Sequence, residues 1–207
     1  MVNGESKNMQ ELLIATKNPG KFGEISEVFR GLPFELLFLG NMDVDDRDFV
    51  EDGFTFAENA RKKAKYFSDK VGMLVLAEDS GILVDALEGE LGVRTRRWGA
   101  GETASDEEWI EHFMKRMEGE GNRGARFKCS ACLIDGDDEK IFDGETCGLI
   151  TEKLMAPLIA GLPLSSCFLA EGCGQVYAAL SAEEKNDVSH RGKAFFQVRD
   201  FLIKVSG

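Results

Sequence analysis

The clearest pattern along the chain is an unbroken hydrophobic run, residues 73–77, that leads into Glu78, Asp79, Ser80 and Gly81. Runs of this kind are typical of buried strands in parallel sheets. The run therefore predicts a strand that brings two adjacent carboxylates to the carboxyl edge of a sheet, where open α/β sheets bind ligands. Because such a pair is costly to bury without a counter-charge, we expect a divalent cation with oxygen ligands there, and Asp79 as the first catalytic candidate. The alternative is a strand end whose acidic side chains face water.

A second short hydrophobic run, residues 12–15, is followed by a polar turn at residues 16–21 that contains two lysines. Hydrophobic residues then recur at helical spacing over residues 22–29. A strand, a polar turn and a helix start aim backbone N–H groups and lysine ammonium groups at an anion. The spacing of a P-loop is absent, and a solvated turn is the alternative interpretation.

The remaining hydrophobic pattern alternates between strands and capped helices, without an internal repeat or a long linker. It predicts a strand at 34–39, helices opening at Thr55, Ser105 and Ser181, a hairpin over 125–134 and 140–150, a strand at 175–179, and a terminal helix capped by Ser189. One compact α/β domain over residues 1–207 follows, with residues 1–10 as a frayed polar tail.

Two residues near the predicted helix at Thr55 are candidates for the same site. Glu51 precedes the helix and offers a second carboxylate for a metal. Lys63 lies on or near the stripe opposite the hydrophobic stripe of the helix. A lysine run on a helix is usually a solvated face, which is the alternative for Lys63.

The terminal helix carries His190 and Arg191 in its first turn. Basic residues at a helix N-terminus oppose the helix dipole and are locally unfavourable. A position that violates local preference is a candidate site, and here an anion would offset the repulsion.

Composition narrows the possible partners. The chain has 207 residues, 43% of them hydrophobic, and a formal net charge of -12. That charge argues against nucleic acid or an anionic membrane as the main partner, whereas a small phosphate ligand beside clustered lysines is compatible with it. No signal-peptide core and no membrane-length hydrophobic run occurs, so we expect a cytoplasmic location.

The five cysteines include one Cys-x-x-Cys pair, Cys129 and Cys132. In a strand these two thiols point to opposite faces, which makes a poor chelate. With two histidines in the chain and no second cysteine pair, buried strand cysteines are favoured over a zinc site.

Several motifs taken together carry a family resemblance. The matching stretches are residues 15–21 with Glu24, 51–64, 77–81 through 93 with Arg97, and 181–191. In this order they resemble the inosine/xanthosine triphosphate pyrophosphatase family, which cleaves non-standard purine nucleoside triphosphates to the monophosphate and pyrophosphate.

The resemblance implies an α/β fold with a long twisted mixed sheet and flanking helices, two lobes with the active-site cleft between them, a homodimer, and Mg²⁺ as cofactor. It implies that Glu51 and Asp79 bind Mg²⁺, that Asp79 also activates water, and that Lys63 stabilises charge at the scissile phosphate. The remaining implied roles concern substrate binding. They fall on Thr16, Asn18 and Lys21 for the triphosphate, on Ser80, and on Lys185, His190 and Arg191 for the base and phosphates.

The chain departs from the family where the base is recognised. Residues 162–166, Leu-Pro-Leu-Ser-Ser, stand where the family has Phe-Gly-Tyr-Asp-Pro, so the stacking aromatic and the reading acid are both replaced. Glu78 replaces an aspartate, and Thr95 with Arg96 replaces Ser-Ala. The leading hypothesis is therefore a Mg²⁺-dependent nucleoside triphosphate pyrophosphatase with altered or relaxed base preference. The alternatives are a pyrophosphatase for another modified nucleotide, or a nucleotide-binding relative with little turnover.

Overall fold

The structure is a computed structural model and describes residues 9–101 and 103–206. Within these residues, six strands form one mixed sheet in the order β2-β1-β3-β4-β5-β6. The strands are β1 (Gln10–Ile14), β2 (Phe34–Phe38), β3 (Leu74–Val84), β4 (Gly124–Asp135), β5 (Asp138–Ile150) and β6 (Phe168–Ala170). The predicted tail, residues 1–10, lies mostly outside the described residues. Its last residue, Gln10, belongs to β1, so the predicted tail is too long at that end.

Strand β3 carries two kinds of pairing. It is parallel to β1 only as far as Leu76, which pairs with Ile14, whereas its antiparallel pairing with β4 continues from Val75 to Val84. The carboxylates of residues 78 and 79 therefore come directly after the end of the parallel pair, as predicted. The strand itself does not end there, because β4 supplies backbone partners for five more residues.

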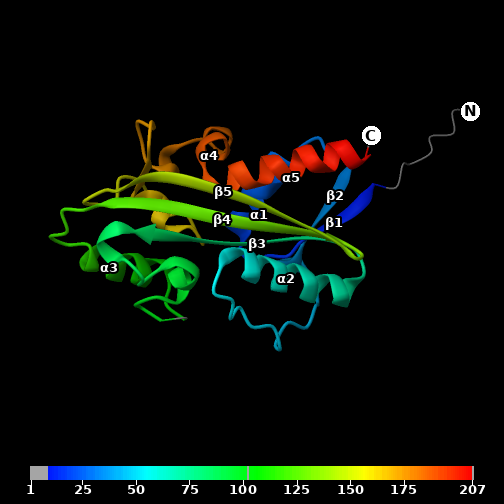
Figure 1. The fold of residues 1–207 in the computed structure, drawn as a ribbon. Coiled ribbons are helices and arrows are strands. Elements are labelled where there is room, and N and C mark those ends of the chain that lie inside the picture. The colour runs from blue at the N-terminus through cyan, green and yellow to red at the C-terminus, as the bar shows by residue number, and fades with distance from the viewer. Residues whose placement is uncertain (1–8, 102, 207) are drawn as a thin grey trace, which may run out of the picture.

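Five helices of the described chain flank this sheet: α1 (Pro19–Val28), α2 (Phe56–Val71), α3 (Asp106–Arg116), α4 (Ala182–Val188) and α5 (His190–Ser206). Helices α2 and α5 cover opposite faces of the long strands, and α3 lies toward the far end on the side of α2 (Figure 1). The predicted capping boxes of α2, α3 and α4 are all formed. None of the helices in the described ranges has the length and hydrophobicity required to cross a membrane.

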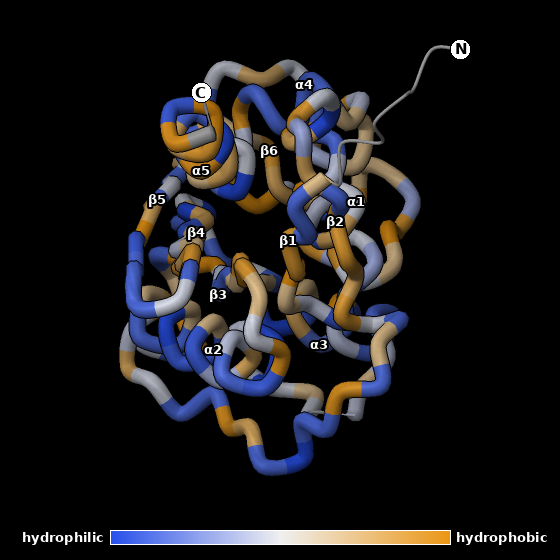
Figure 2. The backbone as a smooth tube through the Cα atoms, turned by 90° about the vertical axis from the view of Figure 1, so that its right-hand side faces the viewer, coloured by the Kyte–Doolittle hydropathy of each residue, from blue (hydrophilic) through white to orange (hydrophobic). Residues whose placement is uncertain are grey.

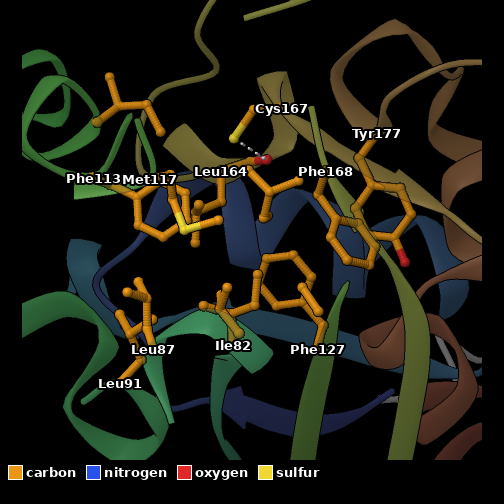
Figure 3. Packing of buried hydrophobic residues seen from close by; sticks show 14 of the residues in the cluster. Ile82, Leu87, Leu91, Phe113, Met117, Phe127, Leu164, Cys167, Phe168 and Tyr177 are labelled. Atoms are coloured by element: carbon orange, nitrogen blue, oxygen red, sulfur yellow. Dashed lines mark hydrogen bonds between the residues drawn. The ribbon is translucent and has the colours of Figure 1, made fainter. Parts of the chain in front are cut away.

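The buried hydrophobic residues form three clusters. One lies between the sheet and α1 with α5, and a second lies between the sheet and α2. The third surrounds α3 and includes Ile82 on the distal half of β3 with Phe127 and Phe168 (Figure 3). Figure 2 shows hydrophobic stretches on β1, on β6 and on the edge strand β2, and hydrophilic stretches along much of the outer coils. The long strands thus connect two packed halves, and the surface between them is available for a site.

One predicted strand is wrong. Residues 175–179 contain a short 3₁₀ helix, Tyr177–Ala179, and the Tyr177 ring packs 5.0 Å from Phe168 between ring centres. The hydrophobic residues of this segment are buried because they pack in the third cluster, without belonging to a strand. Their hydrophobicity therefore indicated burial and not strand structure. The strand that pairs with β5 in this region is β6, which is only three residues long.

Candidate active site

A cavity of about 590 Å³ opens between the two halves. Its walls come from the turn between β1 and α1, the middle of β3, the 3₁₀ helix Gly92–Arg97, the start of α3, the loop at residues 161–165, and the facing ends of α4 and α5. All ten site residues predicted from the sequence line it, namely Thr16, Asn18, Lys21, Glu51, Lys63, Asp79, Ser80, Lys185, His190 and Arg191. The fold therefore brings together segments from the first and last thirds of the chain, from Thr16 to Arg191, while the individual roles remain predictions.

Asp79 is the carboxylate at the centre of the cavity wall. It is 7% exposed, and its Oδ2 accepts a hydrogen bond from Asn59 Nδ2 at 2.9 Å. Burial raises the pKa of Asp79 to about 6, against the opposing effects of Lys63, Lys21 and the Asn59 hydrogen bond. A carboxyl group whose pKa lies near neutrality is suited to exchange a proton with water.

Glu78 has a different environment, although it is the next residue on the strand. Its Oε1 accepts from Lys21 Nζ at 2.5 Å, and its Oε2 lies 3.6 Å from Arg191 Nε. Burial opposes ionisation of Glu78, but Lys21, Arg191 and Lys63 together hold its pKa well below the usual range. Glu78 therefore orients two cations, and is not placed as a free acid.

Lys63 is paired with Glu51, and its Nζ also donates to the backbone oxygen of Glu78 at 3.1 Å. Burial would lower the pKa of Lys63, but Glu51 and Glu78 outweigh that effect and raise it. The ammonium group therefore stays charged in the cavity. The solvated-surface alternative for Lys63 does not hold, because its side chain is only 14% exposed.

Glu51 and Asp79 both line the cavity and are the residues present that could hold Mg²⁺. Within the described ranges, no three His, Cys, Asp or Glu side chains converge as a ready metal cage. Mg²⁺ commonly binds through one or two carboxylates, with water and substrate phosphates completing its octahedron. Two carboxylates beside a cavity lined by lysines fit that habit, and would hold the ion together with a phosphate ligand.

The polar side chains of the turn between β1 and α1 make hydrogen bonds within the turn and to the 161–165 loop, which the sequence did not predict. The Thr16 hydroxyl accepts from the Asn18 backbone N–H at 3.1 Å, and Asn18 Oδ1 caps α1 by accepting from the Lys21 N–H. The Asn18 amide also donates to the Gly161 carbonyl at 3.0 Å. Because both ends of the Asn18 side chain are occupied, this residue shapes the turn, and the Lys21 ammonium, which Glu78 holds, is the cation that the turn brings to the cavity.

Lys185 and Arg191 converge on one acid that the sequence reasoning gave no role. Glu24, on α1, lies 2.6 Å from Lys185 Nζ and 2.8 Å from Arg191 Nη1. Arg191 Nη2 also donates to Ser80 Oγ at 3.0 Å. Burial lowers the pKa of Lys185, partly offset by Glu24, whereas Glu24 and Glu78 raise that of Arg191 despite its burial.

His190 and Arg191, at the start of α5, were expected to be unfavourable beside the positive end of the helix dipole. Groups inside the protein remove this unfavourable charge. Burial drives the pKa of His190 well below its usual range, with Arg191 adding to the effect, so the imidazole is neutral. Its ring stacks on Phe127 at 4.6 Å. The charge of Arg191 is already balanced by Glu24 and Glu78. The sequence argument expected an external anion to offset the basic residues at this helix start. The neutral His190 and the two acids beside Arg191 offset them without one.

The opposite end of the cavity is hydrophobic and aromatic. Leu162 and Leu164 line it, and Ser165 presents a hydroxyl 3.2 Å from Lys185 Nζ. Aromatic rings come from other elements, at Trp109, Phe127 and Tyr177. The loss of an aromatic residue from the loop thus does not leave this end without aromatic lining. The Thr95 hydroxyl is bonded to the backbone of Gly92 and Ile82, so it serves the fold.

Sequence reasoning missed two further residues that organise the site. Asn59 bonds Asp79 through its amide and the Gly53 N–H through its Oδ1 at 2.7 Å, and Glu24 holds the two cations. Asn59 is four positions before Lys63 on α2, and Glu24 is three positions after Lys21 on α1. These spacings place each polar residue on the face of its helix that carries the lysine, which was the available signal.

The thiols of Cys129 and Cys132 lie on opposite faces of the sheet, each buried in a hydrophobic cluster, as predicted from strand alternation. Burial raises the pKa of the Cys132 thiol to about 12, which disfavours the thiolate needed for a metal.

Comparisons with known proteins match this arrangement over nearly the whole chain. A dITP/XTP pyrophosphatase of Geobacter sulfurreducens is 39% identical over 197 residues, covering 94% of this chain and 97% of the relative. One of Caldanaerobacter subterraneus subsp. tengcongensis is 36% identical over 199 residues, covering 95% and 98%.

A solved HAM1 protein from Coxiella burnetii superimposes with a TM-score of 0.81 at 30% identity, over 95% of this chain and 100% of that one. The Ham1 family model matches residues 12–201. These matches confirm the resemblance drawn from the motifs and the α/β fold class, and the chain belongs to the Ham1 family.

Proposed function

We propose that this protein hydrolyses non-standard purine nucleoside triphosphates, of the inosine and xanthosine class, to the monophosphate and pyrophosphate. The observation that carries the proposal is the composition of the cavity at one end, where Asp79 and Glu51 lie beside the cations of Lys21, Lys63 and Arg191. A binding protein without turnover has no need of paired metal carboxylates. The names of the two relatives, both dITP/XTP pyrophosphatases, support the same substrate class.

The chemistry follows from phosphoryl transfer, in which positioning and charge stabilisation provide most of the catalysis. Lys21 and Lys63 bind the phosphates and offset the charge that develops on their oxygens. Asp79 orients the attacking water and accepts its proton while the bond between the α- and β-phosphates breaks. The other end of the cavity, lined by leucines and aromatic rings with the Lys185 ammonium beside Ser165, holds the base.

We further propose that the activity depends on Mg²⁺, held by Glu51 and Asp79 together with substrate phosphates. The ion supplies charge neutralisation on the phosphate oxygens when bound. The support is a pair of cavity carboxylates whose oxygens suit a hard cation. Glu51 pairs with Lys63, and Asp79 accepts hydrogen bonds from the Asn59 amide and the Ser80 N–H.

The decisive experiment is a pyrophosphate-release screen of the purified protein with inosine, xanthosine, adenosine, guanosine and modified triphosphates, each with and without Mg²⁺. We expect release with inosine or xanthosine triphosphate in the presence of Mg²⁺ and loss of activity with a chelator. Release of inorganic phosphate instead of pyrophosphate, or no turnover of any triphosphate, would remove the proposal.

Two properties of the whole protein are part of the proposal. We propose a homodimer, supported by the family resemblance and by exposed hydrophobic side chains at Leu149 and Met155, and light scattering of the purified protein tests it. We propose a cytoplasmic location, supported by the free thiols of all five cysteines, and cell fractionation tests it.

A further inference from the structure

The loop at residues 161–165 is clamped at its first residue, Gly161. Its backbone N–H donates to Asp106 Oδ2 at 2.5 Å, and its carbonyl accepts from Asn18 Nδ2 at 3.0 Å. Both polar groups of one residue are therefore held by side chains from two other segments, 55 and 143 positions away. Contacts of this kind fix the position of a loop more firmly than its own turns do.

The clamp leaves no room for another residue type at this position. Gly161 has a φ of +75°, and a Cβ placed on it would lie 2.6 Å from the Asn18 amide. The neighbouring loop residue Leu162 packs against α1, where a Cβ on Gly20 would lie 3.1 Å from its side chain. The loop is thus seated on the turn that bears Lys21.

The two clamping residues belong to opposite walls of the cavity. Asn18 caps α1 in the turn at the phosphate end, whereas Asp106 is the first residue of α3 in the other half. Asp106 Oδ1 also lies 3.9 Å from Arg96 Nη2, and that guanidinium donates to the Ala104 carbonyl. Asp106 therefore lies where α3, the 3₁₀ helix Gly92–Arg97 and the loop meet at the cavity.

The 161–165 loop also carries three side chains at the proposed base-binding end of the cavity. Leu162 and Leu164 supply hydrophobic surface, and Ser165 meets Lys185. Since these residues follow Gly161 directly, a shift of Gly161 moves all of them relative to the Lys21 turn. The distance between the phosphate-binding and base-binding groups is then set by the clamp.

We propose that Asp106 is a positioning residue for substrate recognition, which holds the 161–165 loop in register with the phosphate-binding turn through Gly161. This role rests on the proposed nucleotide substrate, because it assigns the loop to the base. The residue acts through the Gly161 N–H and does not itself touch the phosphates.

The kinetic test uses inosine triphosphate as substrate and inorganic tripolyphosphate as a competitive inhibitor that reports on the phosphate end alone. For Asp106→Ala we expect KM for inosine triphosphate to rise about tenfold with kcat within about threefold, because one charge-assisted hydrogen bond is lost. The inhibition constant of tripolyphosphate should stay within about twofold. Asp106→Asn keeps an acceptor oxygen and should restore most of the KM, and Glu107→Ala removes an exposed acid from the same turn of α3 as the matched control.

A second readout is independent of activity. In Asp106→Ala, hydrogen exchange of the peptide spanning residues 160–166 should accelerate about tenfold, while peptides from α2 keep the wild-type rate. Unchanged exchange in that peptide overturns the clamp itself, even if no triphosphate is hydrolysed. Equal changes in KM and in the tripolyphosphate constant, or failure of Asp106→Asn to recover, overturn the assignment of Asp106 as a hydrogen-bonding positioning residue.

Discussion

The two ends of the cavity are built on different physical principles. At the phosphate end, charged side chains from α1, α2, β3 and α5 hold one another, as in the contacts of Glu78 with Lys21 and Arg191. At the base end, leucines and aromatic rings provide most of the lining, with Asp106 and Arg96 beside the loop and the Lys185 ammonium against the Ser165 hydroxyl. The first end is organised by ion pairs, and the second by packing.

This difference has consequences for recognition. A buried charge is tolerated only when it is paired, so the charged groups are fixed before any ligand arrives. A mostly hydrophobic pocket discriminates weakly between ligands that differ by one polar group. Substitutions at the phosphate end should therefore affect turnover strongly, and substitutions at the base end should mainly affect selectivity.

The largest effect is expected for Asp79→Asn. The amide can neither take a proton from water nor carry the negative charge, so kcat should fall by a factor on the order of 10² to 10⁴ with the fold intact. Pyrophosphate release measures the loss of kcat, and circular dichroism checks that the fold is intact. Asp85→Asn, an exposed acid just after the same strand, is the matched control, and more than a tenth of the wild-type rate in Asp79→Asn would make the catalytic assignment wrong.

A smaller loss is expected for Lys21→Ala and Lys63→Ala. Each change removes a cation that we propose to bind the phosphates, and kcat/KM should fall by about ten- to a hundredfold. Steady-state kinetics measure this, with Lys65→Ala as the control, since Lys65 is exposed on the same helix and pairs with Asp69. If neither cavity variant changes kcat/KM, the lysines have no part in binding or chemistry.

Glu24→Gln tests the link between the two ends, because Glu24 holds Lys185 and Arg191 together. Removing the acid leaves two buried cations poorly compensated, and the free energy of unfolding at pH 7 should fall by about 3 kcal/mol. Burial opposes ionisation of Glu24, but the two cations lower its pKa below the usual value. Its stabilisation is therefore present above the unfolded-state pKa and is lost as pH falls through the folded-state pKa.

The difference between wild type and Glu24→Gln should accordingly narrow from pH 7 toward pH 3. Urea denaturation at both pH values measures it. A difference that does not change with pH would show that the carboxylate charge is not what stabilises this part of the protein.

The smallest effect concerns the base. We expect the kcat/KM for inosine triphosphate to exceed that for adenosine and guanosine triphosphates by less than about a thousandfold, because the loop lacks the reading acid. Leu162→Phe with Ser165→Asp should sharpen the preference by about ten- to a hundredfold, in line with stacking contributions of about 1–3 kcal/mol per base. A larger preference of the wild-type protein for inosine triphosphate would show that other lining residues, such as Trp109, Phe127 and Tyr177, recognise the base. Pro163 restricts the loop backbone and is the expected obstacle to the double substitution.

The phosphate end was largely predictable from sequence. A hydrophobic run that leads into two acids, lysines in a helix-starting turn, and a basic pair at a helix start are each physically unusual. These patterns marked Asp79 and Arg191 as candidates, whereas Lys63 was open to a solvated-face interpretation until the family resemblance gave it a role. All three line one cavity. The sequence did not predict which acid pairs with which cation. Only the three-dimensional contacts show that Glu78 pairs with Lys21 and that Glu24 pairs with Arg191.

The base end was less predictable because its geometry depends on packing between the two halves. Trp109 is only 1% exposed and belongs to the core beside α3, yet it also lines the cavity. Tyr177 was placed on a strand, and it belongs to a 3₁₀ turn. Short turns have no periodicity that a sequence can show, and the Gly161 clamp joins segments with no common pattern.

The ion pair between Glu24 and Arg191 spans 167 positions of the chain, and this separation has a consequence for biosynthesis. A ribosome makes the strand with Glu78 and Asp79 long before it makes α5, so the nascent chain holds acids and lysines whose partner does not yet exist. The charged end can assemble only when the segment carrying Arg191 has emerged and docked on α1, and such distant contacts are slow to form. We therefore expect a partly synthesised chain to lack an assembled charged end until α5 has docked.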